Sequence, residues 1–262
     1  KGPAIGIDPR PDLNLKVELP PTTKILAMSS DAFFRDHAVH MLHQKPDLVF
    51  IDGMHLFDFA LRDFINVEKH SSPSTLVVID DIYPCHPTQA KRRRKSGSWA
   101  GDVWKLQKIL EQARPDLTLI PLNSYTTGLL LICGLDPKNT TLEEQYSMLV
   151  NRFFKDEEPP VNVLARFGAI PSGHPLLIET ITKLKGFLQK NRSCSDIPDT
   201  LARIKLVIKS VQADYIGKAE SLSGRCLLAD ANTPVGESPG STFLQVFFPQ
   251  LEKPFYKEQY SK

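Results

Sequence analysis

The chain has 262 residues, of which 41% are hydrophobic, and a formal net charge of +2. A chain of this length can bury one large hydrophobic core or two smaller ones. The balanced charge gives no support to a nucleic-acid-binding or membrane-surface protein. No apolar run approaches the ~18 residues of a membrane span. Four cysteines lie far apart and without metal-ligand spacing, so we expect free thiols in a reducing, cytoplasmic setting.

Short apolar runs alternate with amphipathic helical stretches over residues 1–136. Strands that are apolar throughout are buried on both faces, which is typical of a mostly parallel sheet covered by helices. The pattern therefore predicts a doubly wound α/β fold, whose last two strands form a hairpin-like pair. The predicted strands are residues 4–8, 23–30, 46–52, 74–80, 116–122 and 128–135, and the predicted helices are residues 31–44, a stretch through 57–65, and 101–113.

The sequence changes character after Asp136. Thr141, followed by Glu143 and Glu144, is a helix-capping pattern. Further helices are predicted at about 175–190 and 198–222, and two β-like segments at 224–230 and 241–248. We expect an α/β domain over residues 1–136 and a mainly helical C-terminal extension over residues 137–262.

The third and fourth predicted strands both end in acidic residues. Asp52 closes the third strand, and Asp80 and Asp81 close the fourth. Parallel strands end at one edge of the sheet, about 4.8 Å apart, so these carboxylates should meet there. Such a cluster raises its own pKa values unless a cation neutralises it, and Mg²⁺ prefers oxygen ligands of this kind. The alternative is that these acids cap helices or end strands without a metal.

Other polar residues are expected at the same edge of the sheet. His55 lies three residues after Asp52, and an imidazole there can accept a proton from a hydroxyl group. Asp8 closes the first strand, where α/β nucleotide-binding proteins hold a ribose. Ser29, Ser30 and Asp31 follow the second strand and could line an adenine pocket.

Taken in order, the motifs resemble a known family. "IGIDP", "SSDAFF", "DLVFIDGMHLFDFALRDF", "LVVIDDIYP" and "GDVWK" together resemble the class I S-adenosylmethionine-dependent methyltransferases over about residues 4–135. The branch most similar is that of the metal-dependent macrocin and mycinamicin sugar O-methyltransferases, and catechol O-methyltransferase is more distant. The resemblance implies a Rossmann-like methyltransferase sheet, with S-adenosylmethionine and Mg²⁺ or a similar divalent cation as cofactors.

The resemblance also implies a role for each site residue. Asp52, Asp80 and Asp81 match the family's metal-binding acids, and His55 matches a general base. Asp8 matches the acid that holds the cofactor ribose, and we expect Asp52 to lie beside the cofactor as well. The implied reaction is methyl transfer to a hydroxyl group of a small polar acceptor, with saccharides among the candidates. We expect no nucleic-acid or membrane partner, and a homo-oligomer is compatible with the sequence.

One motif of the family is missing. Its glycine-rich loop follows a strand that precedes the "IGIDP" strand, and these 262 residues contain no G-x-G-x-x-G. We expect the chain to begin downstream of that loop. The alternative is a non-catalytic Rossmann-like interaction module that has lost cofactor binding. A third interpretation is a metal-dependent hydrolase that uses the same acids.

The segment after the fourth strand has five consecutive basic residues, Lys91 to Lys95. This run is typical of a solvated loop, and alternatively of a nuclear-localisation signal or a lid that attracts an anion. Trp99 is expected to pack under this segment or to stack on a ring of the acceptor. Asp102 is expected to cap the helix that begins beside it, with a role in the site as the alternative.

Overall fold

The computed structural model describes residues 2–11, 18–175, 177–182 and 196–221. The described residues form two compact units, one of those up to residue 37 and the other of those from residue 38 onward. The predicted β-like segments at 224–230 and 241–248 lie outside the described residues, as does much of the predicted helix at 175–190.

The first unit contains a two-stranded parallel sheet and a helix. Strand β1 (Ala4–Asp8) pairs with β2 (Thr23–Ala27), with Asp8 opposite Ala27. Helix α1 (Ser30–Asp36) follows, and the hydroxyl of Ser29 accepts a hydrogen bond of 3.2 Å from the backbone N–H of Ala32. Ser29 is therefore the N-cap of α1, because its side chain satisfies an N–H group that has no partner within the helix.

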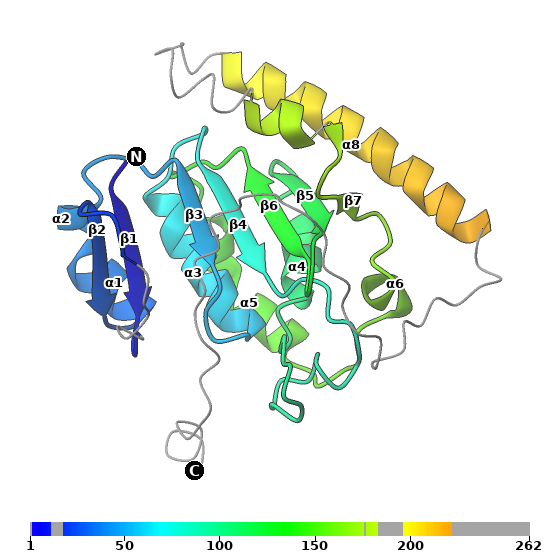
Figure 1. Cartoon of the computed structure of the whole chain (residues 1–262), viewed down its shortest axis with the longest axis horizontal. Helices are drawn as coiled ribbons and strands as arrows, with labels where there is room; N and C mark the ends of the chain where they lie inside the picture. The colour runs from blue at the N-terminus through cyan, green and yellow to red at the C-terminus, as the bar shows by residue number, and fades with distance from the viewer. Residues whose placement is uncertain (1, 12–17, 176, 183–195, 222–262) are drawn as a thin grey trace. The chain divides into compact units, whose positions relative to one another are not determined.

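The second unit is built on a mixed five-stranded sheet (Figure 1). The pair β3–β4 is parallel, β6 runs antiparallel to both β4 and β5, and β7 is parallel to β5. The predicted hairpin-like pair is thus confirmed as β5–β6. The strands, in their order across the sheet, are β3 (Leu48–Ile51), β4 (Leu76–Asp80), β6 (Leu129–Cys133), β5 (Thr118–Asn123) and β7 (Ile170–Pro171).

The predicted helices begin and end close to the expected positions where the structure describes them, with two exceptions. The predicted helix at 31–44 is interrupted at His37, which leaves the helical conformation between α1 and α2. The helix expected from residue 101 begins only at Lys105, because Gly101 has a φ of +60° and residues 101–104 form turns. The helices of the second unit include α2 (Ala38–Met41), α3 (Phe57–Lys69), α4 (Lys105–Ala113), α5 (Thr141–Phe153), α6 (Val161–Leu164) and α8 (Asp196–Ser221).

Helix α5 begins as predicted, but its capping differs from the expected pattern. Thr141 is the first helical residue, and its backbone N–H donates to Oδ1 of Asn139 at 3.0 Å. The hydroxyl of Thr140, the N-cap residue, donates to Oε1 of Glu144 at 2.6 Å. The acidic first turn suits the positive end of the helix dipole. The sequence therefore predicted the helix correctly, but it placed the N-cap residue one position too late in the chain.

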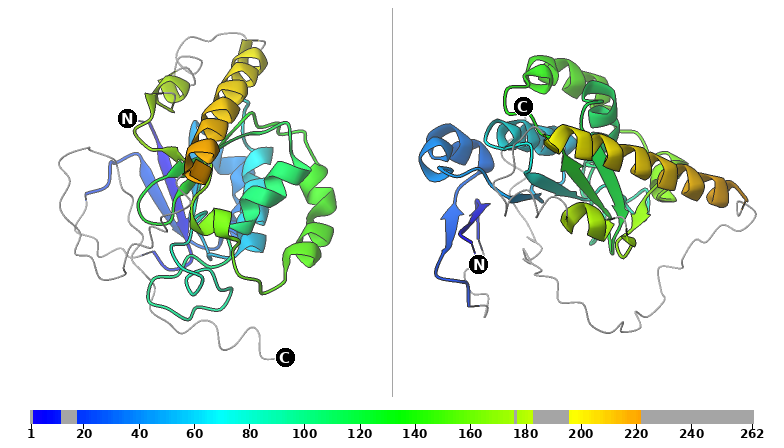
Figure 2. Two further views of the ribbon diagram at one scale, coloured as in Figure 1. Left: turned by 90° about the vertical axis from the view of Figure 1, so that its right-hand side faces the viewer. Right: turned by 90° about the horizontal axis from the view of Figure 1, so that it is seen from above.

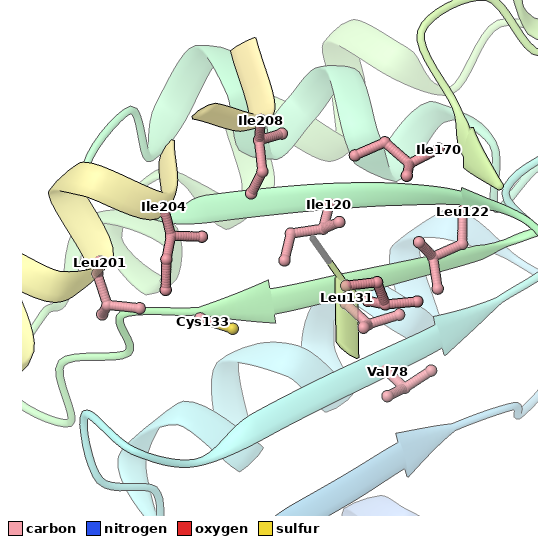
Figure 3. Packing of buried hydrophobic residues seen from close by; sticks show 10 residues of the cluster. Val78, Ile120, Leu122, Leu131, Cys133, Ile170, Leu201, Ile204 and Ile208 are labelled. Carbon is pink, nitrogen blue, oxygen red and sulfur yellow. The ribbon is translucent and has the colours of Figure 1, made fainter. Parts of the chain in front are cut away.

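Helices cover both faces of the five-stranded sheet (Figure 2). Helix α8 packs on one face, where its Leu201, Ile204 and Ile208 contact a cluster of buried side chains (Figure 3). Helices α3, α4 and α5 pack together on the opposite face, toward which Leu130 and Ile132 alternate along β6. Because β4 and β6 are buried on both faces, their uniformly apolar composition follows from their place in the sheet. The clustered residues of the α8 face are Val78, Ile120, Leu122, Leu131, Cys133, Ile170, Leu177, Leu201, Ile204 and Ile208.

A buried ion pair joins the ends of α3 and α4. Arg114, of which 1% is exposed, donates from Nη1 to Oε2 of Glu68 at 2.6 Å and from Nη2 to Oδ2 of Asp116 at 2.7 Å. The other oxygen of Glu68 accepts from the backbone N–H of Asp136 at 3.1 Å. Both members of the buried pair thus have further hydrogen bonds, which a charge removed from water requires.

None of the helices in the described part of the chain is long and apolar enough to cross a membrane.

Candidate metal centre

The site lies at the carboxyl ends of β3 and β4. These strands are parallel neighbours (Figure 1). Ile51 lies opposite Ile79, so the next residues, Asp52 and Asp80, lie side by side at the strand ends. Asp81 follows directly, and His55 lies in the loop between β3 and α3. The prediction that the two acidic strand ends meet at one edge is therefore confirmed.

The structure brings three of these side chains together. Potential ligand atoms of Asp52, His55 and Asp81 all lie within 4.8 Å of one another. Nε2 of His55 is 3.9 Å from Oδ1 of Asp52, and Nδ1 contacts the carboxylate of Asp81 on the other side. The side chain of Asp81 is 8% exposed, compared with 23% for Asp52 and 32% for His55. The imidazole thus stands between two carboxylates in a partly buried pocket, whose lining includes the apolar side chains of Ile51, Ile79 and Val103.

Asp80 makes other contacts. Its Oδ1 accepts hydrogen bonds from the backbone N–H of Asp81 at 2.7 Å and from the hydroxyl of Thr127 at 3.1 Å. Asp80 lines the same pocket but is not part of the group of converging ligand atoms. The sequence predicted Asp52, Asp80 and Asp81 as ligands with His55 as a separate base, whereas the structure groups Asp52 and Asp81 with His55.

Two of the three grouped residues have a backbone conformation that is unusual for residues other than glycine. His55 has a φ of +54° and Asp81 a φ of +66°. Such conformations cost roughly 1–3 kcal/mol each, and they persist only where the surrounding structure holds them. Both strained residues direct their side chains into one site, which supports a functional rather than a packing role for this edge.

The carboxylates perturb one another. Burial, together with repulsion from Asp80 and Asp81, raises the pKa of Asp52 to about 6, although His55 opposes the rise. Burial and the neighbouring Asp81 also raise the pKa of Asp80. Burial alone would lower the pKa of His55, but Asp81, Asp52 and Asp80 outweigh it and raise that pKa. The site therefore carries uncompensated negative charge near neutral pH, which a bound cation would relieve.

The raised pKa of Asp52 predicts a pH-dependent cost to folding. The folded protein holds this proton up to about pH 6, whereas an unfolded chain loses it near 3.8. The stabilising contribution of the protonated group is therefore lost as the pH rises from about 4 through about 6. We expect Asp52→Asn to be more stable than the parent by about 2–3 kcal/mol at pH 7.5, and by much less at pH 4.5.

Urea unfolding at both pH values, in the presence of a chelator, measures this difference. Asp47→Asn is the control, because Asp47 is an exposed carboxylate just before the opposite end of β3. A stability gain for Asp52→Asn that is the same at both pH values would contradict the assignment of a raised pKa to this group.

The predicted cofactor residues other than Asp52 lie in the first unit. Oδ1 of Asp8, at the end of β1, accepts from the backbone N–H of Arg10 at 2.6 Å. Ser29, Ser30 and Asp31 follow β2 at the same edge of that two-stranded sheet, as expected from its parallel pairing. The hydroxyl of Ser29 caps α1, so its structural role accounts for at least one of its hydrogen bonds. A cofactor-binding role for these four residues stays a prediction.

Sequence reasoning missed how the loop at residues 84–104 holds this site. The backbone N–H of Asp102 donates to the carbonyl oxygen of His55 at 3.2 Å. Gly101 approaches so closely that an added Cβ would lie 1.6 Å from that oxygen. Oδ1 of Asp102 also accepts from the backbone N–H of Phe57 at 3.0 Å. Asp102 therefore caps α3, not α4 as predicted, and α3 needs this because its own N-cap residue, Leu56, is apolar.

The basic run is also not a simple solvated loop. Arg92 is paired through both Nη atoms with the carboxylate of Asp58, at 2.9 and 3.0 Å. Lys91 lies 3.3 Å from Glu158. The sequence around Asp58 and Asp102 does not indicate this partner, because Arg62 and Lys105 lie much closer to these two acids along the chain.

The donor set fits a divalent cation. Two carboxylates and one imidazole suit Mn²⁺ and related ions, and carboxylate oxygens alone suit Mg²⁺. Nδ1 of His55 is buried and, within the described part of the chain, has no well-aligned hydrogen bond. An ion held by the two carboxylates would acidify a coordinated hydroxyl group, and a neutral imidazole beside it could accept the proton.

Comparison with known proteins supports a general type of reaction. Residues 4–82 match a family model described as a methyltransferase domain. The match spans less than half of the chain, and it includes Asp8, Asp52, His55, Asp80 and Asp81. It supports a class I methyltransferase of α/β fold and methyl transfer as the type of reaction. The comparison with curated proteins found no match.

Proposed function

We propose that the protein transfers a methyl group from S-adenosylmethionine to a hydroxyl group of a small polar acceptor, with saccharides as the first class to test. The observation that carries the proposal is the convergence of Asp52, His55 and Asp81 at one sheet edge, inside the segment that matches a methyltransferase domain. In this proposal Asp52 and Asp81 hold a divalent cation such as Mg²⁺.

The chain's own residues then have distinct tasks. Asp81, the more buried carboxylate, would hold the cation beside the strand ends, and Asp52 would complete the site from the neighbouring strand. The bound cation would lower the pKa of the acceptor hydroxyl and hold its oxygen in place. His55 accepts the hydroxyl proton, and the acceptor oxygen attacks the methyl group in line with the departing sulfur. Asp8 would hold the cofactor ribose.

The competing proposal is a non-catalytic interaction module. It is favoured by the lack of a G-x-G-x-x-G sequence among the 262 residues, because that loop lets a backbone approach a cofactor closely. A protein of this kind could keep the strand-end acids and the fold without binding S-adenosylmethionine.

Calorimetry with S-adenosylmethionine, with and without Mg²⁺, separates the two proposals. We expect saturable cofactor binding, followed by Mg²⁺-dependent transfer of a radiolabelled methyl group to hydroxyl groups in a panel of sugars. A folded protein that binds neither the cofactor nor a divalent cation would favour the interaction module. Turnover of an ester or phosphoester without methyl transfer would favour a hydrolase.

A further inference from the structure

An aromatic side chain covers the proposed base. The rings of Trp99 and His55 are stacked, with their centroids 5.3 Å apart and their planes at 23°. Trp99 comes from the loop at residues 84–104, which lies between β4 and α4, whereas His55 follows β3. The contact thus joins two loops at the same sheet edge. Neither residue lies in a helix or strand that would fix its side chain by regular packing alone.

The indole is itself held in place. Its Nε1–H donates to the backbone carbonyl of Lys91 at 2.6 Å. The next residue, Arg92, is anchored to Asp58 by two hydrogen bonds and to Oδ2 of Asp102 at 3.2 Å. The guanidinium of Arg92 also lies 4.4 Å from the ring centroid of Phe154. A planar guanidinium bound in this two-pronged way loses much of its freedom, so the loop has a fixed attachment next to the carbonyl that orients Trp99.

The backbone of His55 is held from the same loop. Asp102 donates its N–H to the carbonyl of His55, and Gly101 packs against that carbonyl without space for a Cβ. The remaining freedom of His55 is rotation of its side chain. The stack with Trp99 restricts that rotation, and in the observed orientation Nε2 faces Asp52 while Nδ1 contacts Asp81.

We propose that Trp99 is a positioning residue, which keeps the imidazole of His55 in the plane where it meets both Asp52 and Asp81. This inference rests on the proposed function, because it assigns Trp99 a task in the same site. His55 contacts both carboxylates that would hold the cation, and groups that orient metal ligands without touching the metal affect affinity strongly. Arg92 contributes indirectly, because it anchors the loop that carries Trp99.

The first test examines the stack without cofactor, acceptor or metal. The ring current of a stacked indole shifts imidazole proton resonances upfield, and His55→Asn identifies the His55 signals by their disappearance from the NMR spectrum. We expect Trp99→Ala to move these signals toward the values of an exposed histidine, and Trp99→Phe to retain part of the shift. His55 signals that do not change in Trp99→Ala would overturn the stack.

The second test measures binding of Mn²⁺ by electron paramagnetic resonance. We expect Trp99→Ala to weaken binding by about 10–100-fold and Trp99→Phe to restore it to within a few-fold of the parent. Trp104→Phe, which changes the other tryptophan, is the control and should bind Mn²⁺ like the parent. Urea unfolding of each variant checks that the fold is kept.

The outcomes separate this inference from the proposed function. If the parent binds Mn²⁺ and Trp99→Ala binds it equally well, Trp99 has no positioning role while the metal-assisted function stands. If Trp99→Phe binds Mn²⁺ as weakly as Trp99→Ala does, a flat ring at position 99 does not determine the affinity, and the inference is likewise wrong. If the parent binds no Mn²⁺, the proposed metal site and the positioning role both fail.

Discussion

Replacing Asp81 by asparagine is expected to lower Mg²⁺-dependent methyl transfer by at least about a hundredfold, because a Lewis-acidic cation contributes several kcal/mol to the stability of the transition state. Asp81 is the most buried of the three converging side chains, at 8% exposure, and its carboxylate contacts His55. Asparagine has nearly the same shape and tolerates the positive φ of this position, so the backbone should be retained. The change therefore tests the charge and not the fold.

Asp80→Asn makes the test more specific. Asp80 lies outside the converging group and accepts hydrogen bonds from Thr127 and from the backbone of Asp81. We expect a smaller loss of activity for this variant than for Asp81→Asn. Equal losses would indicate that the cation is held by Asp52, Asp80 and Asp81, as the sequence predicted. Undiminished activity in Asp81→Asn would remove the metal-assisted mechanism, and Asp47→Asn serves as the unaffected control.

The largest effect on stability is expected from Arg114→Ala. This change leaves Glu68 buried without its partner, with 3% of the glutamate side chain exposed, and should reduce the free energy of unfolding by about 3–5 kcal/mol. It also removes the contacts of Arg114 with Asp116, which lies just before β5. Urea unfolding at neutral pH measures the loss.

Two further variants show whether the loss comes from an unpaired charge. Arg203→Ala changes an exposed arginine on α8 and should alter stability by no more than about 0.5 kcal/mol. The double variant Glu68→Met, Arg114→Leu removes both charges and should recover part of the stability lost in Arg114→Ala. A double variant that is less stable than the single one would show instead that the hydrogen bonds of Glu68 carry the effect.

The strand framework could be predicted from the sequence because its signals are local. The apolar runs before Asp52 and Asp80 are β3 and β4, and parallel pairing places their ends side by side. The hairpin-like pair β5–β6 and helix α5 were predicted for the same reason. Composition and periodicity act over a few residues, so they reveal which segments are buried and which are amphipathic.

The details of the site could not be predicted, because they depend on contacts between distant residues and on backbone conformation. Asp102 caps a helix whose first residue lies 45 positions earlier. Arg92 is paired with an acid 34 positions away, and nothing in the run of five basic residues distinguishes it from its neighbours. His55 joins the acids with a backbone φ of +54°, a conformation that is too uncommon for residues other than glycine to be predicted from sequence, although histidine adopts it more often than most. The break at His37 likewise has no proline or glycine to announce it.

The close approach of Gly101 to His55 restricts which sequences can keep this site. A side chain of any size at position 101 would collide with the carbonyl oxygen of His55, 1.6 Å from the Cβ position, and the local φ of +60° disfavours side chains as well. In a saturation library selected for activity, glycine alone should survive at position 101. Gly97 in the same loop has open space around its Cβ position and should accept many residues. The tolerance of one glycine and the intolerance of the other would map where the loop touches the sheet edge that carries Asp52, His55 and Asp81.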